Sequence, residues 1–579
     1  MNDTEAAHGG DGTAYDVCVI GLGPTGLVMA HLLALRGVRV LVLEREPDYY
    51  GMARAVYTDD ECLRILQAAG LADEVHADMV VGLPVQWVRA DGRVLAQFHD
   101  PSRRNGWPTS NFLYQPDFEA TLERRLRERP GVTVRRGRAV LDVGQDGDGA
   151  WIRHQQCTGA AYGRREAELV ADTMETTRAV YVIAADGGRS TVRTQLGIPM
   201  SGKSFPQRWL VIDLHARDGA DAFGHLPYFD FVCDPALPTV SCPQPNGRHR
   251  FEFMLHDDDD PAQFEAADHV RSLLARHVDP DAVIVDRQLV YTFNALVADR
   301  WRAGRIFLAG DAAHMTPQFI GQGMNSGIRD ADNLSWKIAD VLLRQADPAL
   351  LETYESERRP HAESMIGVSV LNKDIVSTSR PTAIRARDWG IGATMKVPGL
   401  RRVLTEAKIK PRPRFRRDTY FGMPRGPLGA AGTLAPQPAV RGPGGRATRL
   451  DDAIGPGWAI VGIGVDPRAV VDAGDWTPVR PRWVSLFPAG SRSRGLPAHG
   501  ASSGEVIDLE AGDAVLGRWL RRTGIRAGDV VILRPDNYVF GVVRATARRT
   551  ARLRVGVDVP AAAVAAMREV YPGHQEVPA

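Results

Sequence analysis

The chain has 579 residues, 44% of them hydrophobic and 24% charged, and its 71 basic and 70 acidic residues give a net charge of +1. This length exceeds one ordinary domain, and the apolar content is enough for several hydrophobic cores, which excludes global disorder. A charge balance this even gives no electrostatic reason to expect nucleic acid or an anionic membrane as a partner.

The N-terminal segment and the cysteines indicate the compartment. Residues 1–14 are polar and lack the basic and apolar regions of a secretory signal, and no stretch approaches the ~20 apolar residues needed to span a bilayer. We therefore expect a cytoplasmic protein with no membrane partner. The five cysteines have no CxxC spacing, which favours buried free thiols over a metal or dithiol site: Cys18, Cys62, Cys157, Cys233 and Cys242.

A βαβ pattern opens the chain. Tyr15–Ile20 predicts a buried strand, a glycine-rich turn and an apolar helix to Arg36 follow, and Val38–Leu43 predicts a second strand. The next predicted elements are a helical pattern over 53–70, a charged amphipathic helix over Asp117–Arg129 and a buried strand over Val180–Ala185.

The pattern changes near residue 206. Alternating apolar and polar residues predict strands of an antiparallel sheet at Trp209–Ala216, Tyr228–Cys233 and Arg250–Leu255. The α/β pattern then returns with a strand at Arg305–Ala309 and long helices over Asn325–Arg344 and Pro348–Val370.

A linker rich in Gly, Pro and Ala covers 422–445. Beyond it, the pattern predicts a separate α/β domain over Arg449–Pro572. Its predicted elements are strands at Trp458–Ile463, Arg482–Phe487 and Val530–Leu533 and a helix over Ala514–Thr523.

The first turn has the form of a dinucleotide fingerprint. Gly21 permits the tight turn, Gly23 lets the backbone approach a pyrophosphate, and Gly26 lets helix and strand pack closely. The helix N-terminus, which includes Pro24 and Thr25, offers free N–H groups to the phosphates. Glu44 follows the second strand and is suitably placed for a ribose diol, and Arg45 is a further candidate contact.

Two later segments separate FAD from NAD. Asp186-Gly187, within residues 184–193, resembles the DG motif of flavoprotein hydroxylases, and Gly310-Asp311, which His314 follows shortly, resembles their GD motif. In those proteins the GD aspartate binds the ribityl chain. Asp311 follows a predicted buried strand, and ligands bind at the carboxyl ends of such strands. We therefore predict FAD as the cofactor.

A glycine-rich turn over 317–325 leads into a long predicted helix. The turn includes Gly323 and Met324, and the helix is predicted to begin near Asn325. The N-terminus of this helix can face the pyrimidine edge of the flavin, where reduction places negative charge, and its positive dipole end would stabilise the anionic reduced ring.

The sequence resembles the 3-(3-hydroxyphenyl)propionate and 3-hydroxycinnamate hydroxylases over nearly its whole length. The segments that carry this resemblance are Arg54-Ala55-Val56, Asp59-Asp60-Glu61, Leu63-Arg64, Gln115-Pro116, residues 250–254, residues 321–327, Arg329-Asp330-Ala331, residues 451–455 and Arg534-Pro535-Asp536.

The resemblance implies an α/β protein with the p-hydroxybenzoate hydroxylase fold. A Rossmann-type FAD-binding domain would carry an inserted antiparallel-sheet substrate domain, and a thioredoxin-like domain would follow. That tail has no cysteine after Cys242, so we expect it to serve packing or oligomerisation, and a homodimer is consistent with this role. The expected division is 14–200 with 290–372 for FAD, 201–289 for substrate, 373–445 for a helical segment and linker, and 446–575 for the tail.

The same resemblance implies roles and chemistry. Arg54 and Gln115 would lie at the FAD, and the backbone of Met324 and Asn325 at the isoalloxazine. NADH or NADPH would reduce FAD, O2 would form a C4a-hydroperoxyflavin, and a phenolic ring would be hydroxylated. The substrate alternatives are a 3-hydroxyphenylpropionate-like acid and a larger aromatic polyketide or antibiotic scaffold, the latter with hydroxylation or a Baeyer–Villiger outcome. A flavin dehydrogenase and a non-enzymatic carrier are the other classes.

The substrate side is less defined. The places that hold the phenol and the carboxylate in p-hydroxybenzoate hydroxylase fall on Phe231, Cys242 and Gln244, which argues against a benzoate. The remaining candidates for substrate contact are Phe253 and Phe319, and those for catalysis are Pro317, Tyr228, Arg208 and His314. Ordinary sheet roles for Tyr228 and Arg208, and a structural role for His314, are the alternatives.

Overall fold

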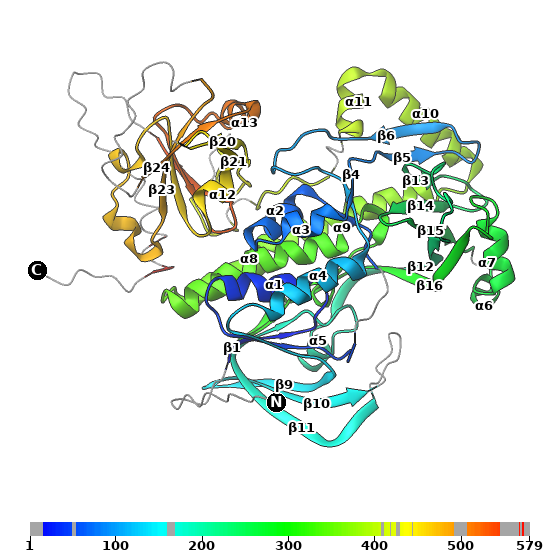
Figure 1. Ribbon diagram of the computed structural model, residues 1–579, viewed down its shortest axis with the longest axis horizontal. Helices are drawn as coiled ribbons and strands as arrows, with labels where there is room; N and C mark the ends of the chain where they lie inside the picture. Colours follow the sequence, from blue (N-terminus) through cyan, green and yellow to red (C-terminus); the bar gives the residue numbers. More distant parts are fainter. Residues whose placement is uncertain are drawn as a thin grey trace, which may run out of the picture.

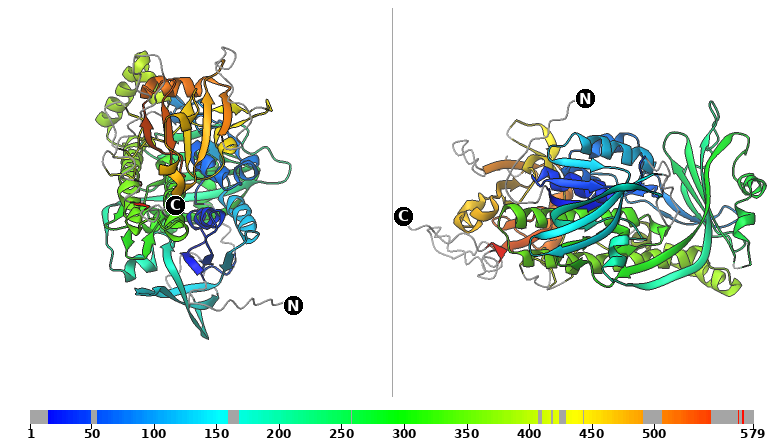
Figure 2. Two further views of the ribbon diagram at one scale, coloured as in Figure 1. Left: turned by 90° about the vertical axis from the view of Figure 1, so that its left-hand side faces the viewer. Right: turned by 90° about the horizontal axis from the view of Figure 1, so that it is seen from below.

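The computed structural model describes residues 15–48, 54–158, 168–256, 258–406, 410–416, 419–423, 429–442, 444–490, 506–544, 567 and 570–571. They form an α/β protein with two eight-stranded sheets, a seven-stranded sheet and a small three-stranded sheet. Figure 1 shows the C-terminal domain and the second sheet on opposite sides of helices α2 (Asp60–Ala68) and α3 (Ala72–Ala77). Figure 2 shows the same parts from two further sides.

The first sheet has the strand order β17-β18-β11-β1-β2-β8, with β9 and β10 continuing beside β11. β1, β2, β8, β11 and β18 pair in parallel, so their carboxyl ends share one edge. The strands are β1 (Tyr15–Ile20), β2 (Val40–Leu43), β8 (Val132–Arg135), β9 (Arg138–Asp146), β10 (Gly149–Thr158), β11 (Glu168–Ala184), β17 (Arg302–Ala303) and β18 (Ile306–Leu308).

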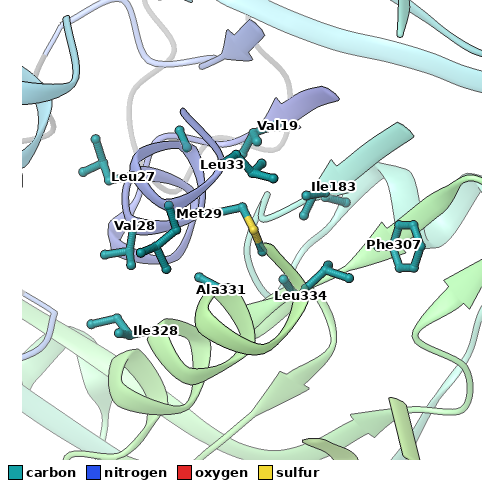
Figure 3. Close-up of a cluster of buried hydrophobic side chains, with 14 of the residues drawn as sticks. Val19, Leu27, Val28, Met29, Leu33, Ile183, Phe307, Ile328, Ala331 and Leu334 are labelled. Atoms are coloured by element: carbon teal, nitrogen blue, oxygen red, sulfur yellow. The ribbon is translucent and has the colours of Figure 1, made fainter. Parts of the chain in front are cut away.

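Helices α1 (Pro24–Leu35) and α8 (Gly323–Leu343) contact each other and pack on this sheet. Figure 3 shows Met29 of α1 pointing toward Leu334 of α8, with Ile183 of β11 nearby, and Leu33 beside Val19 of β1. α1 has no solvent-exposed face in its middle, because every residue from Gly26 to Leu33 is buried. Burying a large apolar side chain stabilises the fold by about 1.5–3 kcal/mol, so this layer fixes α8 against the glycine turn.

The helix predicted over 53–70 is shorter in the structure. α2 begins at Asp60, because the Asp59 carboxylate caps it by accepting the N–H of Cys62 at 3.0 Å. Tyr57–Thr58 instead forms the short strand β3, which pairs with β7 (Asn111–Phe112). Ala53 lies outside the described residues. The segment is therefore an extended connection followed by a helix.

The second sheet has the order β19-β16-β12-β15-β14-β13-β5-β6. Two strands of its edge come from residues 85–98, a segment predicted to lie in the FAD-binding part. β13 pairs in parallel with β5, with Phe231 opposite Trp87. Because these two strands are distant in sequence, no local sequence pattern indicates that they pair. The strands are β5 (Val85–Val88), β6 (Val94–Phe98), β12 (Met200–Ala216), β13 (Phe229–Val232), β14 (Thr239–Gln244), β15 (Arg248–Met254), β16 (Val283–Ala298) and β19 (His314–Met315).

The two faces of the second sheet bury different clusters. One face, which includes Leu210 and Phe253, packs against α6 (Pro261–Phe264) and α7 (Ala267–Leu274). On the other side, Trp209 and Phe231 belong to a cluster with Phe319. Helices α9 (Thr353–Val376), α10 (Pro381–Lys396) and α11 (Pro398–Thr405) also contribute to this second cluster.

The C-terminal domain contains a mixed sheet of order β21-β20-β24-β23-β22-β25-β26. β23 pairs in parallel with β22 and β24, whereas β25 and β26 run antiparallel. Its elements are β20 (Ala439–Arg441), β21 (Ala447–Arg449), α12 (Leu450–Ile454), β22 (Ala459–Ile463), β23 (Arg482–Phe487), β24 (Val506–Ala511), α13 (Ala514–Thr523), β25 (Val530–Leu533) and β26 (Val539–Val543). No helix in the described ranges is both long enough and apolar enough to cross a bilayer.

Buried ion pairs attach the C-terminal domain to α8 and α9. Arg534 donates to Glu357 at 2.7 Å and to Asp536 at 2.5 Å, and Lys337 donates to the same Glu357 at 2.7 Å. Opposite charges hold the pKa of the Glu357 carboxyl down at about 2 against the effect of burial. Removal of one partner would leave a buried charge uncompensated, at a cost of about 3–5 kcal/mol, so this contact couples the two domains.

Candidate active site

The glycine turn between β1 and α1 is fixed by close backbone contacts. Gly21 has φ of 101°, and a Cβ there would lie 2.4 Å from the carbonyl oxygen of Ala185. A Cβ on Gly26 would lie 2.0 Å from the oxygen of Gly21. Gly23 is different, because a Cβ there would meet nothing within 4 Å. Gly21 and Gly26 therefore serve the fold, and Gly23 leaves open space at the N-terminus of α1.

Glu44 lies beside this turn at the end of β2. Its carboxylate accepts the N–H of Leu22 at 2.6 Å and the N–H of Glu46 at 2.8 Å. These bonds hold the acid against the glycine turn, where a ribose was predicted. Arg45 is exposed, and its guanidinium donates to Glu46 at 3.1 Å.

The DG and GD segments meet the turn from the neighbouring strands. Asp186 accepts the N–H of Val192 at 3.2 Å through one oxygen, whereas its Oδ1 is buried and has no hydrogen-bond partner among the described residues. Burial raises the pKa of this carboxyl. Gly187 follows with φ of 81°. A buried acceptor of this kind fits a ligand that donates a hydrogen bond.

Gly310 and Asp311 face the first turn. A Cβ on Gly310 would lie 2.6 Å from the hydroxyl of Thr25, so only glycine permits this approach. The Asp311 side chain is exposed at the protein surface. The many protein atoms around its carboxyl nevertheless reduce hydration of the charged form and raise its pKa, and the charge of Arg54 opposes this effect. An Asp311 oxygen lies 4.0 Å from the position of a Cβ on Gly323. The three predicted cofactor segments thus converge.

His314 supports the GD segment from within. Its Nε2 lies 2.7 Å from Asp330 Oδ2, and the same carboxylate accepts the N–H of Gly310 at 3.0 Å and a guanidinium N–H of Arg358 at 2.9 Å. The His314 side chain is fully buried. This geometry supports a structural role, and its predicted catalytic role has no support from the contacts.

Helix α8 begins at Gly323, two residues before the predicted start at Asn325. Gln322 is its N-cap and makes no capping hydrogen bond through its side chain. The buried side chain of Asn325 donates to the carbonyl oxygen of Gly321 at 2.6 Å and accepts the Thr58 hydroxyl at 2.9 Å. These bonds of the Asn325 side chain hold the turn against β3.

Arg54 and Gln115 form one unit. The Gln115 side-chain oxygen accepts the N–H of Arg54 at 2.8 Å and the N–H of Ala55 at 2.5 Å. The Arg54 carbonyl accepts a guanidinium N–H of Arg250 at 2.7 Å. This unit connects α4 (Gln115–Arg127), the segment before β3, and β15.

A cavity of about 950 Å³ adjoins this region. One part of its wall is aromatic, and Phe229 lies between Phe112 at 5.6 Å and Phe231 at 5.0 Å between ring centroids. The predicted substrate contacts Phe231 and Phe319 both line it. The wall includes Val56, Tyr57, Asp60, Arg104, Phe112, Phe229, Phe231, Phe319, Gly321, Gln322, Lys410, Arg412, Arg518, Trp519 and Arg522.

Other predicted substrate and catalytic residues lie outside the wall of this cavity. Cys242 and Gln244 are buried in β14, and Phe253 packs on the opposite face of the sheet. Tyr228 is 38% exposed, and Arg208 donates to the carbonyl oxygen of Asp259 at 2.9 Å. The carbonyl oxygen of Pro317 accepts the hydroxyl of Ser369. Their roles at the substrate stay predictions.

Several cavity residues had no role in the sequence predictions. Lys410 donates to Asp59 at 2.6 Å, and Asp59 also binds Arg329. Asp60 accepts the side-chain N–H of Asn105 at 2.9 Å. Asp59 and Asp60 stand in a segment that carried the family resemblance, which was the available signal. No sequence motif singled out Lys410.

The chain matches two families of known proteins and several curated hydroxylases. The family described as "FAD binding domain" matches residues 14–369, and the family described as "HcaD C-terminal domain" matches residues 432–554. A 3-(3-hydroxy-phenyl)propionate/3-hydroxycinnamic acid hydroxylase 2 of Burkholderia vietnamiensis is 36% identical over 90% of this chain and 92% of its own length. A hydroxylase of the same description from Mycolicibacterium smegmatis is 36% identical over 91% and 90%.

Solved structures share the fold. A ternary complex of aklavinone-11 hydroxylase with FAD and aklavinone has a TM-score of 0.72 at 23% identity, covering 99% of this chain and all of that chain. A p-nitrophenol 4-monooxygenase of Pseudomonas putida has a TM-score of 0.62 at 25% identity, covering 69% of this chain and 98% of that chain.

Together the site and these matches define an FAD-dependent aromatic monooxygenase. Within that class, the chain belongs to the FAD-binding-domain hydroxylase family that includes the 3-(3-hydroxyphenyl)propionate hydroxylases.

Proposed function

We propose that this enzyme hydroxylates a phenolic ring that carries a carboxylate side chain, of the 3-(3-hydroxyphenyl)propionate or 3-hydroxycinnamate type, with NADH or NADPH and O2. The observation that carries the proposal is the aromatic-walled cavity, which borders Gly321 and Gln322 directly before the N-terminus of α8. The activity named for the relatives supports the same substrate class.

The residues around the glycine turn fit FAD. Gly23 would receive the pyrophosphate, Glu44 the ribose and Asp311 the ribityl chain. Bound FAD accepts a hydride from the nicotinamide cofactor and, with O2, supplies the oxygen that enters the aromatic ring. The orphaned Oδ1 of Asp186 is a further acceptor for a donor on the cofactor.

The N-terminus of α8 would stabilise negative charge on the reduced ring. Its first N–H groups have no side-chain cap, and the helix dipole places about half a positive charge there. The Asn325 side chain keeps this turn in position through its bonds to Gly321 and Thr58. The charge stabilisation therefore comes from backbone held before the reaction begins.

The aromatic wall would orient the substrate ring and exclude water. Phe319 contacts Trp209 at 5.1 Å and Phe293 at 5.6 Å between ring centroids, which fixes its side chain. Phe229 and Phe112 form a stacked pair nearby. Large apolar rings in fixed positions restrict a planar substrate to few orientations.

Asp60 is our candidate for the base that accepts the phenol proton. It lines the cavity, and within the described residues its carboxylate accepts a hydrogen bond from the Asn105 side chain. Burial raises the pKa of its carboxyl to about 7, against the opposing effect of Lys410. A proton acceptor with a pKa near the working pH is the most effective base.

The test is oxidation of NADH and of NADPH by the purified yellow holoenzyme with a panel of aromatic compounds. We expect substrate-stimulated oxidation, O2 consumption and a product heavier by one oxygen atom for 3-(3-hydroxyphenyl)propionate or 3-hydroxycinnamate. Hydroxylation of a polycyclic aromatic alone would favour the alternative of a larger scaffold. Cofactor oxidation that yields only hydrogen peroxide with every phenolic acid would contradict the proposal.

We also infer the finer organisation. The division would be 14–200 with 290–372 for FAD and 201–289 for substrate with 85–98 added. The helical connection would be 373–438, and the thioredoxin-like domain would be 439–575 rather than 446–575, because β20 pairs within its sheet. The mixed sheet of that domain supports the last assignment, and the domain contains no cysteine for dithiol chemistry. A cytoplasmic homodimer remains part of the proposal.

A further inference from the structure

The C-terminal domain contributes one wall of the cavity. Arg518, Trp519 and Arg522 of α13 line it, together with Val515 and Thr523. Spacings of three and four residues place these side chains on one face of the helix. Leu516 and Leu520 point instead into the core of the domain. α13 is therefore anchored on one side and presents two arginines to the cavity on the other.

Three more arginines line the cavity from other segments. Arg104 lies in the connection between β6 and β7, and Arg412 and Arg414 lie in the described stretch 410–416. Burial lowers the pKa of Arg104. The Asp60 carboxylate opposes this effect, whereas the positive charges of Arg412 and Arg522 add to it, so these charged groups are near one another. We call Arg104, Arg412, Arg518 and Arg522 the arginine rim. Three of them are exposed, so this end of the cavity reaches solvent.

Within the described residues, no side chain of the arginine rim forms an ion pair with a carboxylate, although Asp60 and Glu61 are near enough to raise the pKa of Arg104. Of the acids in the same cavity, Glu61 binds Arg329 at 2.7 Å and Asp60 binds Asn105. The Asp100 carboxylate accepts the N–H of Ser102 at 2.9 Å, and Glu406 is the remaining acid of the wall. Like charges gathered without paired carboxylates repel each other, and an anionic ligand would relieve that repulsion.

We propose that the arginine rim captures the carboxylate of the aromatic substrate, so that the C-terminal domain determines substrate specificity. The planar guanidinium group suits a carboxylate because it donates two parallel hydrogen bonds. The second sheet does not supply such a group to the cavity, since Cys242 and Gln244 lie outside its wall. The identity of the carboxylate as part of the hydroxylated molecule rests on the proposed function.

The test uses equilibrium binding, which needs no turnover. The flavin absorbance of the holoenzyme is titrated with 3-phenylpropionate, which lacks the phenol, and with its primary amide. For the double variant Arg518→Gln/Arg522→Gln, we expect the Kd of the acid to rise about tenfold and that of the amide to stay unchanged, because two exposed ion pairs are lost. Salt should weaken binding of the acid in the parent and much less in the variant.

Arg521→Gln is the matched control. It removes one charge from the same helix at an exposed position outside the cavity wall, so the Kd of the acid should stay within twofold of the parent. Equal binding of acid and amide to the parent, failure of the acid to bind, or equal loss of both ligands in the double variant would overturn the proposal.

Turnover separates this inference from the proposed function. With the hydroxylated phenolic acid, the double variant should raise KM and keep kcat at saturation. If the holoenzyme hydroxylates no phenolic acid but discriminates acid from amide, the arginine rim holds and the proposed function fails. If turnover is present with KM unchanged in the double variant, the arginine rim fails and the proposed function holds.

Discussion

The cofactor end of the active site consists mainly of backbone, whereas the substrate end consists mainly of side chains. At the cofactor end, short segments bring backbone together, and the residue type follows from contact distances such as that of Gly26 to the oxygen of Gly21. At the substrate end, the wall consists of side chains from distant segments, including Tyr57, Phe229, Lys410 and Arg518. A backbone site therefore dictates its sequence locally, whereas a side-chain cavity depends on how whole domains meet.

The largest expected effect is the loss of FAD binding at the glycine turn. Gly26→Ala places a Cβ 2.0 Å from a backbone oxygen, so the turn must move. We expect a colourless protein with a lower Tm even before FAD is added. Gly23→Ala should behave differently, because its Cβ meets no protein atom within 4 Å. The apoprotein should keep its Tm and bind FAD more weakly, by about 100-fold.

Flavin absorbance and thermal unfolding of both apoproteins check this pair. Gly367→Ala is the control, since this exposed residue of α9 also has open space around it. It should retain FAD and gain slightly in stability, because Ala favours helix over Gly. Retention of FAD by Gly26→Ala would contradict the assignment of this turn.

The next effect concerns the proposed base. If the Asp60 carboxylate accepts the phenol proton, kcat/KM of the parent should rise with pH up to about 7 and then level off. Asp60→Asn should lower kcat/KM by about 100-fold above that pH and remove the inflection. Stopped-flow reduction by NADH without substrate is the control and should be unchanged. An inflection near 7 that persists in Asp60→Asn would assign it to another group.

Asp60→Asn, which should lower kcat/KM, should in contrast raise stability relative to the parent as the pH increases. Because burial raises the folded-state pKa of Asp60 above that of the unfolded chain, the folded state holds its proton to higher pH. The parent should lose this contribution to stability as the pH rises from about 4 to about 7. Asp60→Asn lacks the titration, so its Tm relative to the parent should rise across that window.

The sequence predicted FAD as the cofactor and much of the fold, because both depend on local patterns. Strands such as Tyr15–Ile20, Arg482–Phe487 and Val530–Leu533, together with the helix Ala514–Thr523, carry local patterns, and their observed bounds equal the predicted ones. The cavity could not be predicted in this way. The pairing of β13 with β5 and the approach of α13 depend on tertiary packing, which no local pattern records.

A pair of phenylalanines sharpens the contrast within the second sheet. Phe229 lines the cavity, whereas Phe253, also predicted to contact substrate, packs on the opposite face. We expect Phe229→Leu to raise KM about tenfold, because a ring contact is lost. Phe253→Leu should cost about 1 kcal/mol of stability and leave KM unchanged. Steady-state kinetics and urea unfolding separate the outcomes, and a raised KM in Phe253→Leu would restore the sequence prediction.

The smallest expected effect concerns Tyr228, a catalytic candidate from sequence. A tyrosine that donates to or accepts from the phenol must reach the substrate cavity, but Tyr228 is 38% exposed and does not line its wall. Tyr228→Phe removes only the hydroxyl, so kcat and KM should stay within twofold of the parent, as is usual for a surface change. A loss of 100-fold in kcat with bound FAD intact would place this hydroxyl in the reaction, and would mean that the cavity wall rearranges when substrate binds.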